Sequence, residues 1–259
     1  MSHRLDLYVS RASWLHRLDP RPKMAFVTAS FALLLLNDGP APMLGYLLAA
    51  HVLLRSAGIP WPRIAWLWRR MWPISLTIFV LWPLFYATGE PVVFDWWRLR
   101  ITIPSLVQGL TSALRIDALA FAVFIMLVST DQTRLVQGLV KLGLPFEWGL
   151  SVAIALRYLP LLDGTYRTIT DAQRARGWTP ERSSLLKRAR AHIPTLVALV
   201  IAALRLSDSL TRALAARGFQ PGQPRTSRRP LQMHPADWCA LLVSALLLAA
   251  AVALRFVQL

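Results

Sequence analysis

The amino-acid sequence predicts an all-α, polytopic membrane protein with about five transmembrane helices and long amphipathic helices between the fourth and the fifth. Hydrophobic residues fill 55% of the 259 positions and charged residues only 16%, compared with about 25% in soluble domains. Long apolar runs recur in the first half of the chain and once more near its end. From 131 to 235, apolar residues instead recur at helical spacing among frequent charges, as in amphipathic helices.

These patterns divide the chain into three segments. Residues 1–130 hold an N-terminal cytoplasmic segment and four expected spans, over 24–36, 43–54, 71–88 and 105–130. Residues 131–235 hold the amphipathic helices, and 236–259 hold the last span, over 236–257. The first run is about 20 Å long at 1.5 Å per residue. We therefore expect it to tilt or to pair closely with neighbours in a hydrocarbon core about 30 Å thick.

The formal net charge is +16, which in a soluble protein would suggest nucleic acid. Here the basic residues avoid the apolar runs and gather in the N-terminus, the loop 55–70 and the region 131–235. That bias fits the positive-inside rule. We expect these segments to lie in the cytoplasm, the lipid bilayer to be a partner, and nucleic acid not to be one. The N-terminus lacks a signal-peptide core, so we expect the first span to be retained.

The segment 13–23 leads into the first span. Pro20 and Pro22 are expected to prevent a regular helix across Asp19 to Lys23, and Asp19 is expected to cap the turn through its side chain. On physical grounds alone, the segment with Arg21 and Lys23 could equally be a basic anchor beside the membrane.

The fourth span contains two charged residues, Arg115 and Asp117. Charges at membrane depth are costly and usually face protein or water. The two positions point in different directions on a helix, so they need not pair with each other. They either snorkel or lie in a cavity near the outer end, or they form a polar anchor for helix packing or for a partner. Arg255, near the end of the last span, is expected to snorkel, and Cys239 to be a buried, unreactive thiol.

The amphipathic region contains several helix punctuation signals. Gly143 and Pro145 are expected to end one helix, and Pro160 is expected to bend the next, which carries Arg157. Asp208 stands three and four positions from Arg205 and Arg212, a spacing that allows ion pairs on one helix face.

A six-residue pattern then occurs twice: Ala175-Arg176-Gly177-Trp178-Thr179-Pro180 and Ala216-Arg217-Gly218-Phe219-Gln220-Pro221. Glycine suits the left-handed residue just past a helix, the aromatic can fold back as in a Schellman cap, and proline stops the helix from resuming. Each copy alone could be an ordinary capped helix. Two matched copies suggest two helix tips, each presenting one arginine to a carboxylate on a partner.

These motifs resemble those of the transmembrane coupling (T) component of energy-coupling factor transporters, the CbiQ-like and EcfT-like proteins. The similarity covers about Ser13 to Pro221 in five landmarks. They are Leu-His-x-Leu-Asp-Pro-Arg-x-Lys at 15–23, Leu-Gly-Leu-Pro at 142–145, Leu-Arg-Tyr-x-Pro at 156–160, where the family has Leu-Arg-Phe-x-Pro, and the two Ala-Arg-Gly copies. The family often also has an arginine near the position of Arg115.

The resemblance implies a coupling subunit that works with two ATP-binding cassette ATPase subunits and a membrane-embedded substrate-binding (S) subunit. It implies that Arg176 and Arg217 each engage a groove on one ATPase, and that the substrate is a vitamin or a transition metal ion chosen by the S subunit. The docking residues implied are Ala175, Arg176, Gly177, Ala216, Arg217 and Gly218. The supporting residues are Asp19, Pro20, Arg21, Lys23, Arg115, Arg157, Pro160, Gln173, Arg174 and Asp208.

The sequence contains no phosphate-binding loop of the Gly-x-x-x-x-Gly-Lys-Ser/Thr type, no histidines at metal-ligand spacing and no nucleophile–base motif. We therefore expect a non-catalytic subunit without a cofactor. Two alternatives stay open: a polytopic membrane enzyme with a basic cytoplasmic face and a buried site at Arg115 and Asp117, and a scaffold held on the membrane by its basic face alone.

Overall fold

The computed structural model describes residues 8–9, 11, 13–86, 90–96, 99–178, 190–220, 222 and 231–258. The chain forms two compact units. The first, here called the bundle unit, comprises His3–Gly138 and Leu231–Leu259. The second, here called the helix-pair unit, comprises Leu139–Pro230.

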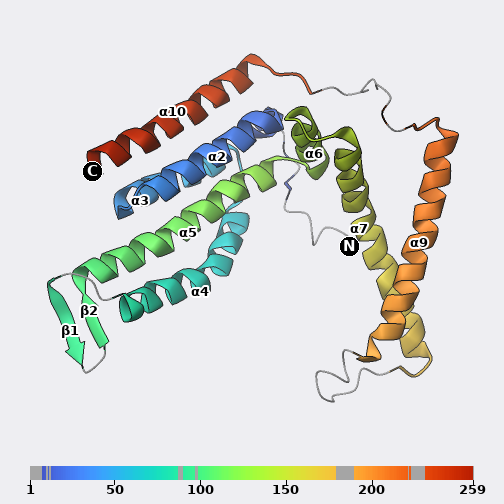
Figure 1. The fold of residues 1–259 in the computed structure, drawn as a ribbon, viewed down its shortest axis with the longest axis horizontal. Coiled ribbons are helices and arrows are strands. Elements are labelled where there is room, and N and C mark those ends of the chain that lie inside the picture. The colour runs from blue at the N-terminus through green and yellow to red at the C-terminus, as the bar shows by residue number, and fades with distance from the viewer. Residues whose placement is uncertain are drawn as a thin grey trace. The chain divides into compact units, whose positions relative to one another are not determined.

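The bundle unit is helical, with one β-hairpin. Its elements are α1 (Trp14–Arg17), α2 (Pro20–Leu36), α3 (Pro40–Ser56), α4 (Trp61–Phe85), β1 (Val92–Trp96), β2 (Leu99–Thr102), α5 (Ile103–Ser129), most of α6 (Gln132–Lys141) and α10 (Pro235–Gln258). Helix α5 is central, because it packs against α2, α3 and α4, and α10 packs along α2 (Figure 1). The antiparallel hairpin connects the end of α4 to the start of α5.

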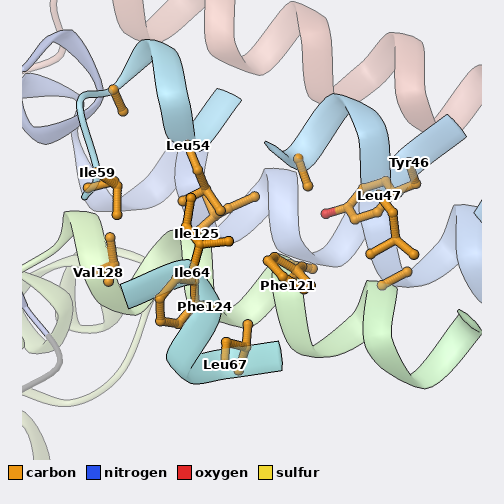
Figure 2. Close-up of a cluster of buried hydrophobic side chains, with 14 of the residues drawn as sticks. Tyr46, Leu47, Leu54, Ile59, Ile64, Leu67, Phe121, Phe124, Ile125 and Val128 are labelled. Carbon is orange, nitrogen blue, oxygen red and sulfur yellow. The ribbon is translucent and has the colours of Figure 1, made fainter. Parts of the chain in front are cut away.

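The core of the bundle unit lies where α3, α4 and α5 meet (Figure 2). Leu54 of α3, Ile64 of α4 and Phe121 of α5 are all 0% exposed. Ile125 and Val128 continue the same face of α5 toward its C-terminal end. Truncating a buried Phe such as Phe121 to Ala typically costs about 3–5 kcal/mol, so this cluster is the main apolar stabilisation of the unit.

Three of the described helices are long and apolar enough to cross a membrane: Ile103–Ser129, Ile193–Ala216 and Pro235–Phe256. The first and the third correspond to the spans expected at 105–130 and 236–257. Helices α2 and α3 have 17 residues each, or about 25 Å at 1.5 Å per residue, which is short of the membrane core. The second, Ile193–Ala216, lies in the helix-pair unit, where the sequence predicted amphipathic helices. This helix is more apolar than predicted, because its length and composition would allow it to cross a membrane.

Proline positions correct two sequence-based expectations. Pro20 and Pro22 do not prevent a helix, because they occupy the first turn of α2, where the backbone N–H groups need no helical partner. For the same reason α4 begins at Trp61 with Pro62 in its first turn, within the segment 55–70 that was expected to be a loop. The segment 89–104, also expected to be a loop, contains the hairpin.

Cys239 was expected to be buried, and this was wrong. Its side chain is exposed. Helix α10 packs along α2 on one side, and its other faces are left uncovered, including Trp238, which is 61% exposed. Burial of an apolar run in the membrane is thus burial in lipid, which leaves such residues exposed on the protein itself.

The helix-pair unit consists of α7 (Phe146–Ala175) and α9 (Ile193–Ala216), which pack antiparallel. Near one end Thr195 of α9 donates a hydrogen bond to Gln173 of α7. At the other end the backbone N–H of Gly222 lies 3.4 Å from Oε1 of Glu147. These two contacts show that the start of each helix lies beside the end of the other. Helix α7 continues through Pro160, which lies inside it.

Candidate functional site: two arginine tips

Helix α7 ends in a Schellman motif. The N–H of Gly177 donates to the carbonyl of Arg174 at 2.9 Å, and the N–H of Trp178 donates to the carbonyl of Gln173 at 3.0 Å. Gly177 has φ +86°, a left-handed conformation that glycine adopts without a Cβ clash. The predicted cap is confirmed, and it fixes the direction in which the chain leaves the helix at Arg176.

Helix α9 ends in the same way. The N–H of Gly218 donates to the carbonyl of Ala215 at 2.9 Å, and the N–H of Phe219 donates to the carbonyl of Leu214 at 3.0 Å. Gly218 has φ +72°. The matched hydrogen bonds show that the repeated sequence pattern encodes one backbone motif twice.

Each tip presents its arginine at the C-cap position. Arg176 and Arg217 have φ −87° and −89°, and both side chains are exposed. Within the described part of the chain, neither guanidinium has a hydrogen bond or an ion pair. The carbonyl end of a helix carries partial negative charge, which favours a cation there. A free, bidentate-capable donor therefore stands at the end of each helix.

The two tips lie at opposite ends of the helix pair. The first tip, at Arg176, lies near the start of α9, because Trp178 Nε1 donates to the carbonyl of Ala191 at 3.1 Å. The second tip, at Arg217, follows all 24 residues of α9. At 1.5 Å per residue, the helix between them is about 36 Å long. One small carboxylate ligand cannot bridge that distance, so the two tips require two separate partner sites.

The first tip is braced against α9 by side chains. Besides the indole hydrogen bond, the Trp178 ring meets the His192 ring edge-on, with centroids 5.2 Å apart. Oγ1 of Thr195, which is 0% exposed, donates to Oε1 of Gln173 at 2.8 Å. Gln173, a predicted supporting residue, therefore holds α7 to α9 directly beneath the tip. Sequence reasoning did not assign this role to Thr195 or His192, and Thr195 gave no local signal.

A polar hollow lies beside the first tip, between the last turns of α7 and the first residues of α9. Its lining includes Tyr166, Asp171, Arg174 and His192. Arg174 is paired with Asp171 at 3.6 Å, and both side chains are mostly exposed. Exposed pairs of this kind contribute little stability, so Arg174 can exchange its partner for another acidic group.

Two other predicted supporting residues in this unit stand apart from the tips. Arg157 and Asp208 are exposed. Among the residues that the structure describes, Asp208 has no ion pair with Arg205 or Arg212, although the spacing allows one. Helical spacing permits such a pair, but the gain at an exposed site rarely offsets the loss of side-chain freedom.

The predicted residues of the entry segment lie in the bundle unit, where they form a clasp among three helices. Asp19 caps α2 by accepting the N–H of Arg21 at 3.0 Å, as predicted. The N–H of Asp19 donates to Oδ1 of Asp237 in the first turn of α10 at 2.8 Å. Lys23 Nζ donates to the carbonyl of Ser129 at 2.9 Å, at the end of α5. Lys23 thus meets the negative end of the α5 dipole.

Pro20 and Asp237 complete this clasp. A Cβ on Gly138 of α6 would lie 2.9 Å from Cβ of Pro20, so α6 packs closely on the start of α2. Asp237 is 1% exposed, and its Oδ2 accepts the N–H of His234 at 2.7 Å. Sequence reasoning missed Asp237. An acidic residue in the first turn of the last span was the signal available.

His16 belongs to the same end of the bundle. Its Nδ1 lies 2.6 Å from Ser13 Oγ, and the side chain is buried. Burial lowers the pKa of His16 from its ordinary value, and the charges of Lys23 and Arg11 lower it further. The neutral imidazole is therefore the form that the fold favours.

Arg115 and Asp117 do not pair with each other, which agrees with the expectation that they need not. Arg115 donates to the carbonyl of Asn37 at 2.8 Å and to Oδ1 of Asp38 at 3.1 Å. Arg255 reaches the other oxygen of Asp38 at 3.0 Å. Asp117 is 3% exposed and lies 2.6 Å from Ser75 Oγ of α4. These charges anchor helices to one another, and Asp38 is the shared residue that sequence reasoning missed.

Comparison with known proteins gives one family. The sequence profile of the family described as cobalt transport protein (CbiQ) matches residues 11–228. The chain is 32% identical to the energy-coupling factor transporter transmembrane protein EcfT of Listeria innocua over 255 residues, 94% of each chain. It is 31% identical to EcfT of Thermosediminibacter oceani over 261 residues, covering 96% of this chain and 97% of that one. EcfT of Lactococcus lactis is 31% identical over 240 residues, 89% of each chain.

Proposed function

This chain belongs to the CbiQ family and is a transmembrane component of an energy-coupling factor transporter; we propose that it is the subunit that transmits ATP-driven motion to substrate uptake. Its partners in this proposal are two ATP-binding cassette ATPase subunits and a membrane-embedded S subunit. The substrate is a vitamin or a transition metal ion such as cobalt or nickel, bound by the S subunit. ATP hydrolysis takes place in the partner chains.

One observation carries the proposal: the pair of matched, Schellman-capped arginine tips at opposite ends of one helix pair. Two equal tips about 36 Å apart suit two similar subunits, each offering one acidic groove. Docking residues are Ala175, Arg176, Gly177, Ala216, Arg217 and Gly218. When the ATPases approach or separate, tips held in both grooves would tilt or spread the helix pair.

The S subunit is proposed to ride on the apolar face of α9. Six large apolar side chains of α9 are 46–61% exposed: Ile193, Leu196, Val197, Val200, Ile201 and Leu204. Left in water, such a face would be unfavourable by about 25 cal/mol per Å². The antiparallel partner α7 carries exposed charges, including the Asp163–Arg167 pair. We infer that the pair lies along the cytoplasmic surface of the cell membrane, with the apolar face of α9 toward lipid and the S subunit.

The test is to purify the transporter through a tag on this chain and to measure both bound ATPase and substrate uptake. Arg176→Ala with Arg217→Ala should release the ATPases or abolish uptake while leaving membrane insertion intact. In the proposed complex, docking buries each arginine against a carboxylate of one ATPase. Losing either of these charge-assisted pairs should weaken docking by about 2–5 kcal/mol. Arg212→Ala is the matched control, because Arg212 is an exposed arginine of α9 that lies before the tip.

Charge-conserving variants distinguish specific docking from simple attraction to a basic surface. Arg176→Lys with Arg217→Lys keeps the charge but removes the bidentate fork. Loss of bound ATPase in this variant supports docking in a shaped groove. Retention of ATPase and full uptake in both the lysine and the alanine double variants would refute the proposed role of the tips.

A further inference from the structure

A small apolar cavity lies within the bundle unit, at the end that carries the clasp. Its volume is about 170 Å³. Five helices line it, through residues that include Trp14 of α1, Phe26 of α2, Leu53 of α3, Met126 of α5, and Ala240 and Val243 of α10. Lys23 contributes only its stem, because its ammonium group is held by Ser129 and Thr130. The interior therefore offers no free polar group to a ligand or to water.

The cavity opens to the outside of the bundle. Trp14 and Val243 are each 50% exposed, whereas Leu15 and Ile125, which also line the cavity, are 4% and 3% exposed. An apolar cavity of about 150 Å³ in another protein stays dry and takes up benzene-sized apolar molecules. The occupant that fits a narrow apolar cavity open beside a membrane-spanning helix is a stretch of hydrocarbon chain.

Two exposed arginines lie on helices that line the cavity. Arg17, one turn after Trp14, is exposed, and so is Arg55 in the last turn of α3. Within the described residues, neither arginine has an ion pair. The nearby carboxylates of Asp19 and Asp237 are buried and accept backbone N–H groups. Arg17 and Arg55 are therefore the exposed cations on the lining helices α1 and α3 that could meet a phosphate group.

We propose that this cavity binds an acyl chain of an anionic phospholipid, with the lipid phosphate near Arg17 and Arg55. The site is independent of the arginine tips, which lie in the other unit. An acyl chain in the cavity would fill the space between α1, α2, α3, α5 and α10, at the end of the bundle that carries the clasp. The bound lipid would then be a structural part of the bundle, unlike the bulk lipid around it.

The experiment is native mass spectrometry of the full chain in detergent, with phosphatidylglycerol or phosphatidylcholine of identical acyl chains added in equal amounts. The wild-type chain should retain phosphatidylglycerol at least about fivefold more than phosphatidylcholine, which is the effect of about 1 kcal/mol from one arginine, and up to about thirtyfold more where both arginines contribute. Ala240→Leu fills the cavity and should lower retention of both lipids about tenfold, since it removes the room for about two methylene groups. Ala249→Leu, on an exposed position of α10, is the matched control and should retain lipid as the wild type does.

The headgroup contact has its own variant. Arg17→Gln with Arg55→Gln should lower phosphatidylglycerol retention much more than phosphatidylcholine retention, because the choline cation already offsets the phosphate charge of phosphatidylcholine, so that the variant retains the two lipids about equally. Circular dichroism and gel filtration establish that each variant folds; Val27→Phe, also lining the cavity, replaces Ala240→Leu if that variant does not. Equal lipid retention by the wild type and by a folded variant with a filled cavity would refute the cavity as the lipid-binding site. Equal retention of both lipids by the wild type, or a co-purified peptide in place of lipid, would overturn the anionic phospholipid as occupant.

Discussion

The bundle unit and the helix-pair unit use charged side chains in opposite ways. In the bundle unit, Lys23 and Asp237 are buried and their polar atoms bind backbone groups of neighbouring helices. In the helix-pair unit, Arg176 and Arg217 are exposed at helix ends, without a partner among the described residues. Charges satisfied inside a fold contribute to stability, and charges left free at a fixed angle are available to a partner.

Apolar side chains show the same contrast. Leu34 and Phe121 of the bundle unit are 0% exposed, whereas Val200 and Leu204 of α9 are 58% and 61% exposed. The bundle unit covers its own core, and the helix pair leaves an apolar face for lipid or another subunit to cover. Substitutions in the bundle unit should therefore change stability first, and substitutions at the tips should change assembly first.

Among the charged residues, the largest stability effect is expected for Asp237→Ala. The variant loses the hydrogen bonds from Asp19 and His234 and leaves those buried N–H groups unpaired. Loss of a charge-assisted hydrogen bond typically costs about 1.5–3 kcal/mol, so we expect the free energy of unfolding to fall by about 3 kcal/mol. Titration with sodium dodecyl sulfate, followed by circular dichroism, measures it. Asp208→Ala, an exposed control in the helix-pair unit, should change it by less than about 0.5 kcal/mol; equal effects would contradict the contrast.

Two glycine substitutions should change stability in opposite directions. Gly138→Ala places a Cβ 2.9 Å from Cβ of Pro20 in the bundle unit, and overpacking of this kind costs about 1–3 kcal/mol. Gly164, inside α7, has no atom within 4 Å of such a Cβ. Gly164→Ala should stabilise α7 by up to about 1 kcal/mol. Sodium dodecyl sulfate titration of both variants measures the two changes, and destabilisation by Gly164→Ala would show that α7 has a close neighbour at this position.

The sequence predicted local features better than distant ones. The helix ends at Gly177 and Gly218 were predictable, because a Schellman cap is specified by consecutive residues. The cap by Asp19 was predictable for the same reason. Its second partner, Asp237, lies 218 positions away, and no local pattern connects the two. The bracing of Gln173 by Thr195 and the binding of Arg115 to Asp38 also depend on how helices meet.

The wrong expectations share one cause, which is that the same residue type behaves differently with position. Proline stops a helix in its interior but suits its first turn, so α2 and α4 begin with Pro20 and Pro62 near their starts. Cys239 lies in an apolar run, yet it is exposed because α10 packs on one side only. Hydrophobicity alone does not distinguish a side that faces protein from a side that faces lipid.

A smaller effect is expected from the glycines of the tips. Gly177→Ala and Gly218→Ala each force an alanine into φ +86° or +72°, which costs about 1–2 kcal/mol. The penalty should fray the last turn of the helix and misdirect the arginine, so that ATPase co-purification falls by about five- to thirtyfold. Hydrogen exchange at Trp178 and Phe219 measures the fraying directly. Faster exchange together with normal ATPase recovery would show that docking does not require an intact helix cap.

The two tips should not respond equally, because only the first is braced by an indole hydrogen bond, which runs to Ala191 just before α9. Trp178→Phe removes the hydrogen bond to the carbonyl of Ala191 but keeps an aromatic ring, as the second tip has in Phe219. We expect a destabilisation of about 0.5–1.5 kcal/mol, read out as faster exchange of amides at the start of α9. Phe219→Leu is the comparison at the second tip, where no exchange difference at the start of α9 is expected.

The smallest effect is a pH dependence confined to the bundle unit. The lowered pKa of His16 means that the unfolded chain binds a proton more readily than the folded chain does. The contribution of neutral His16 to the free energy of unfolding is therefore fully present above the ordinary histidine pKa, about 6.5. It is lost as the pH falls below that value, with a slope of at most about 1.4 kcal/mol per pH unit for one group. His16→Gln should remove this component, because glutamine does not titrate, while Arg11 and Lys23, the charges that act on His16, remain. Titrations with sodium dodecyl sulfate between pH 5 and 8, in wild type and variant, measure the difference. Equal slopes would show that another group carries the acid sensitivity, and that the neutral form of His16 is not required by the fold.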